Sequence, residues 1–84
     1  MDDDTLLAVC RTTYDRVWAA TGGSVDATRD AIRVELERAG FTPATHDREM
    51  MQGANTVFAM LADGRYVRLD RQGNWQVHRY QRAL

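Results

Sequence analysis

Apolar and polar residues alternate along the last third of the chain, which is the pattern of half-buried β-strands. The alternation predicts strands over about 55–62, 65–70 and 74–80. Asp63-Gly64 separates the first two strands, and a turn over 71–73 that ends in glycine separates the last two. Turns this short join antiparallel neighbours, so we expect a three-stranded antiparallel meander.

A different period governs the first forty residues, where apolar side chains recur at helical spacing. The first helix is expected over about 5–20, with Asp4 or Thr5 as its N-cap and Gly22-Gly23 as its end.

The second helix is expected over about 24–39, with Ser24 or Asp26 as its N-cap. Gly40 is a suitable left-handed stop, and Phe41 can fold back onto the last turn as in a Schellman motif.

The order of these elements predicts an α+β fold, ααβββ, with both helices packed on one face of the meander. The 84 residues are expected to form a single small domain. Residues 42–54 follow neither period. They fit either one helical turn, capped by Thr45 or Asp47, or a loop that leads into the first strand.

Counting from the two turns gives an expected register. A two-residue loop pairs Ala62 with Arg65, and a three-residue loop pairs Asp70 with Asn74. The face expected to meet the helices then carries Phe58, Met60, Val67, Leu69, Trp75 and Val77. The outer face carries Val57, Ala59, Leu61, Tyr66, Arg68, Gln76, His78 and Tyr80.

This outer face joins aliphatic, aromatic and charged side chains, whereas a half-exposed sheet usually presents polar ones. Either another part of the chain covers it, or it contacts a macromolecular partner, protein before nucleic acid. The expected binding surface consists of Leu61, Arg65, Tyr66, Arg68, Gln76, His78, Arg79 and Tyr80. A homodimer is also expected, through the apolar side chains of Val57, Ala59, Leu61 and Tyr66, or alternatively through Tyr14 and Trp18 on the first helix.

Charge is distributed unevenly along the chain. Residues 1–62 hold six arginines and ten acidic residues, while residues 63–84 hold five arginines and two aspartates. The basic C-terminal part fits an acidic partner, or attraction to the acidic helices within the fold. RNA or DNA binding is the first alternative function, because arginines can track phosphates while Tyr66 and Tyr80 stack on bases.

No strong catalytic, metal-binding or cofactor motif occurs, so we expect a domain without cofactor and without catalysis. Cys10 is the only cysteine, and His46-Asp47 fits a turn or cap pairing. A second alternative is a small metal-independent ribonuclease in which His78, beside Tyr66, moves protons.

The run Ala39-Gly40-Phe41, placed between a helix and strands, resembles small toxin ribonucleases of the HicA type. The resemblance implies a sheet like that of double-stranded-RNA-binding domains and a catalytic histidine at the entry to a strand. Here the run 53–58 contains no histidine, and an extra helix precedes the shared elements. These departures argue against the activity of that family.

The start of the chain is acidic, unlike a signal peptide, and no apolar run approaches the ~20 residues that span a membrane. A cytoplasmic location is therefore expected. The size suggests a small regulator of the kind that mobile elements encode.

Overall fold

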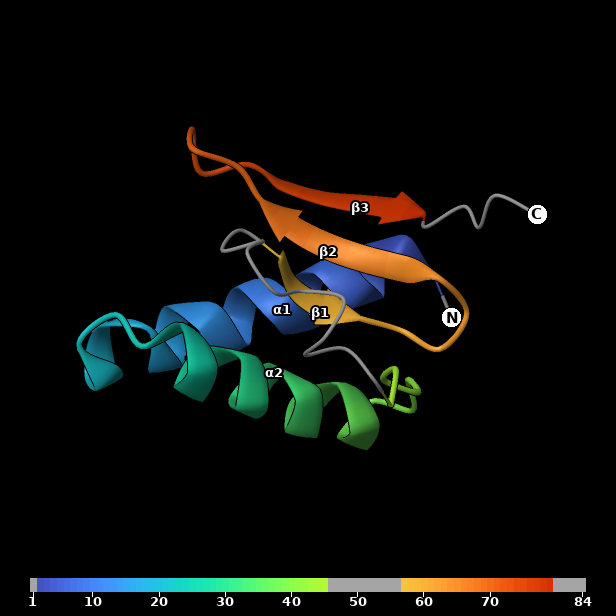
Figure 1. Ribbon diagram of the computed structural model, residues 1–84, viewed down its shortest axis with the longest axis horizontal. Coiled ribbons are helices and arrows are strands. Elements are labelled where there is room, and N and C mark those ends of the chain that lie inside the picture. Colours follow the sequence, from blue (N-terminus) through green and yellow to red (C-terminus); the bar gives the residue numbers. More distant parts are fainter. Residues whose placement is uncertain (1, 46–56, 80–84) are drawn as a thin grey trace.

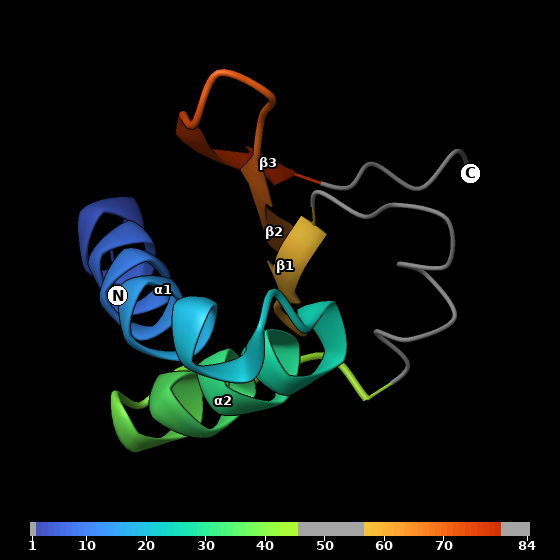
Figure 2. The same ribbon diagram turned by 90° about the vertical axis from the view of Figure 1, so that its left-hand side faces the viewer.

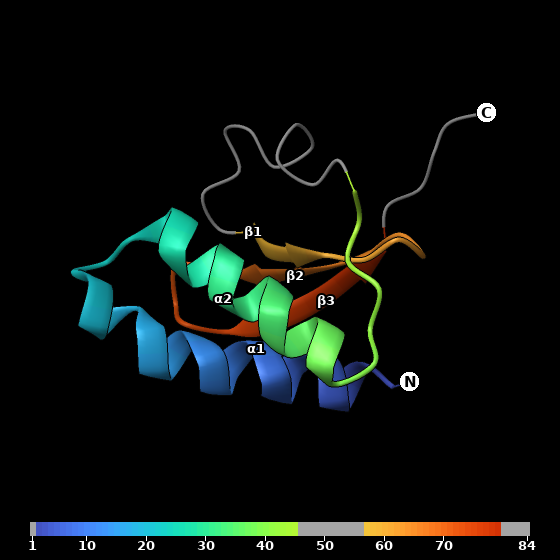
Figure 3. The same ribbon diagram turned by 90° about the horizontal axis from the view of Figure 1, so that it is seen from below.

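The computed structural model describes residues 2–45 and 57–79 and confirms the predicted α+β order. Its elements are α1 (Asp3–Val17), the short 3₁₀ helix η1 (Ala19–Thr21), α2 (Val25–Arg38), β1 (Val57–Met60), β2 (Arg65–Leu69) and β3 (Trp75–Arg79). The strands form one antiparallel sheet in the order β1-β2-β3. Both helices lie on the same face of this sheet (Figures 1 and 3).

Helix α1 begins two residues before the predicted start, so the expectation of Asp4 or Thr5 as the N-cap was wrong. The side chain of Asp2 caps the helix instead and accepts a hydrogen bond of 2.8 Å from the amide of Thr5. Asp3 and Asp4 then lie in the first turn, where the helix dipole favours negative charge. Gly22, with φ of 67°, ends the helical segment.

Helix α2 confirms both predicted ends. The side chain of Ser24 accepts a hydrogen bond of 3.1 Å from the amide of Ala27. At the other end Gly40 has φ of 92°, and the amide of Phe41 donates to the carbonyl of Leu36 over 2.9 Å. This is the Schellman arrangement, which directs Phe41 back into the core.

The register between β2 and β3 is the predicted one, with Leu69 opposite Trp75 and Val67 opposite Val77. The amide of Asp70 donates to the carbonyl of Asn74 over 3.0 Å, so the connecting loop has three residues. The carboxylate of Asp70 accepts hydrogen bonds from the amides of Gln72 and Asn74, both 2.9 Å, and so fixes the turn.

The predicted register between β1 and β2 was wrong by one residue. The amide of Leu61 donates to the carbonyl of Arg65 over 2.7 Å, so Ala62 belongs to a three-residue loop with Asp63 and Gly64. Met60 therefore faces Tyr66. A slip of one residue exchanges the two faces of a strand. Leu61 and Ala59, which were expected outside, lie in the core, and Met60 lies in a second cluster with Tyr66.

Phe58 stays in the core despite the slip, because β1 contains a bulge. Val57 pairs with Arg68 and Ala59 pairs with Val67, which leaves Phe58 as the extra residue of β1. In the shifted register without a bulge, the Phe58 ring would point to the outer face. The bulge turns it back toward the helices.

The core lies between the helix pair and the sheet, with α2 packed against β1 and α1 against β3 (Figure 2). Four aromatic rings join these layers. Tyr14 stacks on Trp18 with centroids 5.1 Å apart and meets Phe58 and Trp75 edge-on, each at 5.3 Å. Cys10 is fully buried in the same core, and burial raises the pKa of its thiol to about 12.

Candidate functional site

Four of the eight predicted surface residues come together on the outer face of β2 and β3. Tyr66 lies opposite His78, and Arg68 lies opposite Gln76. Arg68 and Gln76 are exposed, while Tyr66 and His78 are half-buried. We call these four residues the outer patch. Tyr80 and residues 46–56 lie outside the described residues, so the predicted place of Tyr80 and most of the 42–54 segment are not described.

The outer patch has defined side-chain geometry. The rings of Tyr66 and His78 stack with centroids 5.2 Å apart and an angle of 19° between their planes. His78 Nε2 lies 3.0 Å from Gln76 Oε1, and Gln76 Nε2 donates to Asp70 Oδ2 over 3.4 Å. A line of contacts thus runs from the β2–β3 turn to the stacked rings and orders the patch.

Asp70 is the charged end of this line. The hydrogen bond from the Asn74 amide lowers the pKa of its carboxyl group, and the positive charge of Arg68 lowers it further. Asp70 therefore stays ionised and accepts hydrogen bonds from the turn and from Gln76 together.

The apolar half of the predicted outer face is not available as a homodimer surface. Ala59 and Leu61 are buried on the helix side, with Leu61 only 3% exposed, so the expectation that Leu61 faces outward was wrong. Val57 remains on the outer side, where it is buried with Met60 against Ala44 and Tyr66. Ala44, in the segment that follows α2, thus helps to cover this part of the sheet, as one interpretation of the sequence expected.

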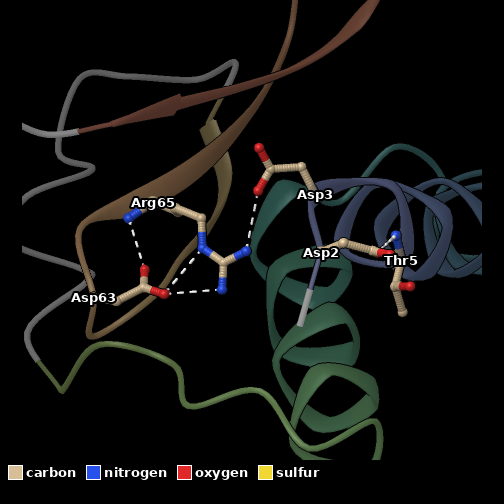
Figure 4. A network of polar contacts seen from close by, with 5 residues as sticks. All are labelled: Asp2, Asp3, Thr5, Asp63 and Arg65. Carbon is tan, nitrogen blue, oxygen red and sulfur yellow. Dashed lines mark hydrogen bonds and ion pairs between the residues drawn. The ribbon is translucent and has the colours of Figure 1, made fainter.

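Arg65, which was expected to belong to the binding surface, alternates with Tyr66 along β2 and is buried on the helix side. Its guanidinium donates to Asp63 (2.9 Å from Nε, 2.8 Å from Nη2) and to Asp3 (3.0 Å), as Figure 4 shows. It also lies over the ring of Phe41, 5.7 Å from the centroid. Arg65 therefore ties the β1–β2 turn to the start of α1.

Its partner Asp63 is held in the ionised form. The side-chain hydrogen bonds from Arg65 lower the pKa of the Asp63 carboxyl group, and the backbone amide of Arg65 adds a further bond of 3.0 Å. Arg65 thus fits the interpretation in which basic strands and acidic helices attract each other within the fold.

Arg79 is the cross-strand partner of Arg65 and lies on the same side of the sheet, but it is exposed. The two arginines therefore have different environments at neighbouring positions. The guanidinium of Arg65 is buried among its partners, whereas the charged side chain of Arg79 lies at the surface, at the end of β3.

The outer edge of β1 is covered by other parts of the chain. Arg29 Nε donates to the carbonyl of Val57 over 2.7 Å, and the amide of Ala44 donates to the carbonyl of Met60 over 2.9 Å. Arg33 Nη1 donates to the carbonyl of Ala44 over 3.1 Å, and Pro43 forms an isolated antiparallel β-bridge with Leu61. Sequence reasoning missed these two arginines, because their contacts span the gap between α2 and the sheet.

The outer edge of β3 differs. Asp70 and Asn74 form a hydrogen-bonded pair, so the backbone groups of Gln76 and His78 also point toward β2. The backbone N–H and C=O groups of Trp75, Val77 and Arg79 then point the other way. Within 2–45 and 57–79 no segment pairs with this side of β3. The sequence carried a signal for this edge, since the last strand of a three-stranded meander is always an edge strand.

Among residues 2–45 and 57–79, no cluster of three or more His, Cys, Asp or Glu side chains is arranged to hold a metal ion. No helix in these ranges is both long and apolar enough to cross a bilayer. Comparison of the chain with protein-family models, with curated proteins and with solved structures found no significant match.

Proposed function

We propose that this domain binds a protein partner, without catalysis, through the outer patch. The observation that carries the proposal is the ordered stack of Tyr66 on His78, flanked by Arg68 and Gln76 on two paired strands. Tyrosine and arginine are the residue types that protein interfaces concentrate.

The internal contacts of the patch support binding. The side chains stand on strands and not on loops, and Gln76 and His78 take part in the contacts that begin at Asp70. A preorganised surface loses less side-chain entropy when a partner docks. The helices lie on the opposite face of the sheet, so docking here leaves the core undisturbed (Figure 2).

Nucleic-acid binding is the alternative, and two features weaken it. One face of the Tyr66 ring is already occupied by His78, and Arg65 is neutralised by Asp63 and Asp3. A domain that neutralised three to five phosphates would show a log–log salt slope of roughly −2 to −5. We expect only weak association with RNA or DNA, because the first part of the chain carries excess negative charge.

A photo-crosslinking amino acid placed at Gln76 tests the proposal in the native cell. We expect a discrete protein adduct. An excess of unlabelled wild-type domain should prevent its formation, whereas the same excess of the double variant Tyr66→Ala, Arg68→Ala should not. The matched control is the same amino acid at Val34, a side chain on α2 that is 46% exposed.

An identical set of adducts from positions 76 and 34 contradicts the proposal, because the contact would then not be specific to the patch. An adduct from position 76 that nuclease destroys contradicts it as well and promotes the nucleic-acid alternative. The folding of the double variant is checked by its thermal melting curve.

A further inference from the structure

We propose that the outer edge of β3, which no segment in residues 2–45 and 57–79 pairs with, receives an acidic, extended segment of the partner protein as a fourth strand of the sheet. The inference rests on the proposed function and names the kind of partner segment and the way it docks. Extended peptides commonly bind in this way to open sheet edges, where backbone hydrogen bonds supply affinity and alternate side chains supply specificity.

The backbone of β3 is arranged for such pairing. Gln76 and His78 direct their N–H and C=O groups to β2, and Trp75, Val77 and Arg79 direct theirs to the open side. The backbone groups of these three alternate residues offer enough donors and acceptors for one added strand. β3 contains no proline and no bulge, which are two of the features that block an edge.

The contrast with β1 shows that this protein does protect an edge elsewhere. Along β1 the outward carbonyls of Val57 and Met60 accept hydrogen bonds from Arg29 and Ala44, and the segment that covers them contains Pro43. Natural sheets cover or blunt exposed edges to prevent unwanted pairing. In the described part of the chain only β3 is left open, on the strand that carries half of the outer patch.

The side chains around β3 define the sequence of the incoming strand. Directly paired residues share a face, so inward residues of the segment meet the half-buried Trp75 and Val77, and outward residues meet Gln76 and His78. Three exposed arginines lie near this strand: Arg71 in the turn before β3, Arg68 on the outer face of β2 opposite Gln76, and Arg79 at the end of β3 on the inward face. The segment that fits alternates apolar residues with glutamate or aspartate. A second copy of β3 fits less well, because it adds another basic strand.

Short blocked peptides that alternate glutamate and valine are the probe. We expect saturable binding well below about 1 mM, and at least about tenfold weaker binding when lysine replaces glutamate. Two further peptides carry N-methyl groups either on the valines or on the glutamates. In an antiparallel added strand the valine amides face β3, so methylated valines should weaken binding at least about tenfold, and methylated glutamates should leave it unchanged.

A protein variant and hydrogen exchange locate the contact. Val77→Pro removes only an amide that points away from β2, so it should abolish binding, while Val77→Thr keeps this amide and should bind like wild type. Adding the peptide should slow exchange of the Val77 and Arg79 amides at least about tenfold, whereas Gln76 and His78 are already protected by the ladder. If Val77→Pro does not fold, the methylated peptides and the exchange data still decide.

The inference is overturned if neither methylated peptide is weakened, if the lysine peptide binds as well, or if no binding is seen up to about 1 mM. Light scattering could also show a dimer, with the Val77 and Arg79 amides protected from exchange in the absence of peptide. That result would mean that a second copy of the chain, and not an acidic segment, occupies the edge. A specific crosslink from position 76 with no effect of methylation leaves the proposed function standing and removes only this inference.

Discussion

β1 and β3 are the two edge strands of one small sheet, and they lie in very different surroundings. All four residues of β1 are buried, while β3 has none that is fully buried and two that are exposed. Helix α2 and residues 42–44 cover the outer edge of β1, and α1 supports β3 from one face only (Figure 1).

The difference predicts that β1 serves mainly folding and that β3 serves mainly the proposed binding. β1 contributes core side chains on one face and the buried pair Val57 and Met60 on the other. β3 contributes half-buried Trp75 and Val77 inward, and exposed Gln76 with half-buried His78 outward. A substitution in β1 should therefore act mainly on stability, and an outward substitution in β3 mainly on binding.

The largest expected effect tests this division with two aromatic rings of the same cluster. Phe58 is 4% exposed and sits in the bulge of β1, so Phe58→Ala should lower the free energy of unfolding by about 3–5 kcal/mol. Trp75→Ala should cost less, nearer to 3 kcal/mol, because Trp75 is only half-buried in β3. Urea denaturation measures both values. If Trp75→Ala costs more than Phe58→Ala, the centre of the core lies at β3 and the comparison fails.

The next effect compares two arginines that face each other across β2 and β3. Arg65→Ala removes charge-assisted hydrogen bonds to Asp63 and Asp3 in a nearly buried site and should cost about 2 kcal/mol. Arg79→Ala removes an exposed side chain and should change stability by no more than about 0.5 kcal/mol. Equal losses in thermal or urea unfolding would show that Arg65 acts as an ordinary surface charge.

The sequence was sufficient for the element order and for the β2–β3 register, because that turn is specified locally. Asp70 accepts from two amides of its own turn, and Gly73, with φ of 84°, closes it. The β1–β2 turn was misjudged, because Asp63-Gly64 is equally compatible with a longer loop. The carboxylate of Asp63 binds both the amide and the guanidinium of Arg65, and Ala62 joins the loop.

Hydrophobic pattern did not correct this error, because β1 is apolar at every position. Either register of β1 against β2 buries an apolar set of side chains. Because of the bulge at Phe58, the strand buries Ala59 and Leu61 of the observed register and also Phe58 of the predicted one. The outer patch was largely predictable, since Tyr66, Arg68, Gln76 and His78 depend only on the β2–β3 register. The covered edge of β1 was not, because it depends on contacts from Arg29 and residues 42–44 that are distant in sequence.

The smallest expected effect compares the two turns through pH. Both Asp63 and Asp70 have a lowered pKa in the folded protein, so the unfolded chain takes up their protons first as the pH falls. Their stabilising contributions are complete above about pH 5 and are lost as the pH falls through the folded values. At neutral pH Asp63→Asn should lower stability by no more than about 1 kcal/mol, because the carboxylate is 52% exposed.

Asp70→Asn is the matched control, because an amide oxygen still accepts hydrogen bonds from the Gln72 and Asn74 amides. It should therefore lower stability less than Asp63→Asn does at pH 7, and that smaller loss should also fade as the pH falls. The gap between wild type and Asp63→Asn should close between about pH 5 and pH 2, since protonation removes the same charge from wild type that the substitution removes. Urea unfolding across this range measures the gap. A gap that stays constant with pH would mean that the β1–β2 turn is held by shape and backbone hydrogen bonds and not by the ion pair with Arg65.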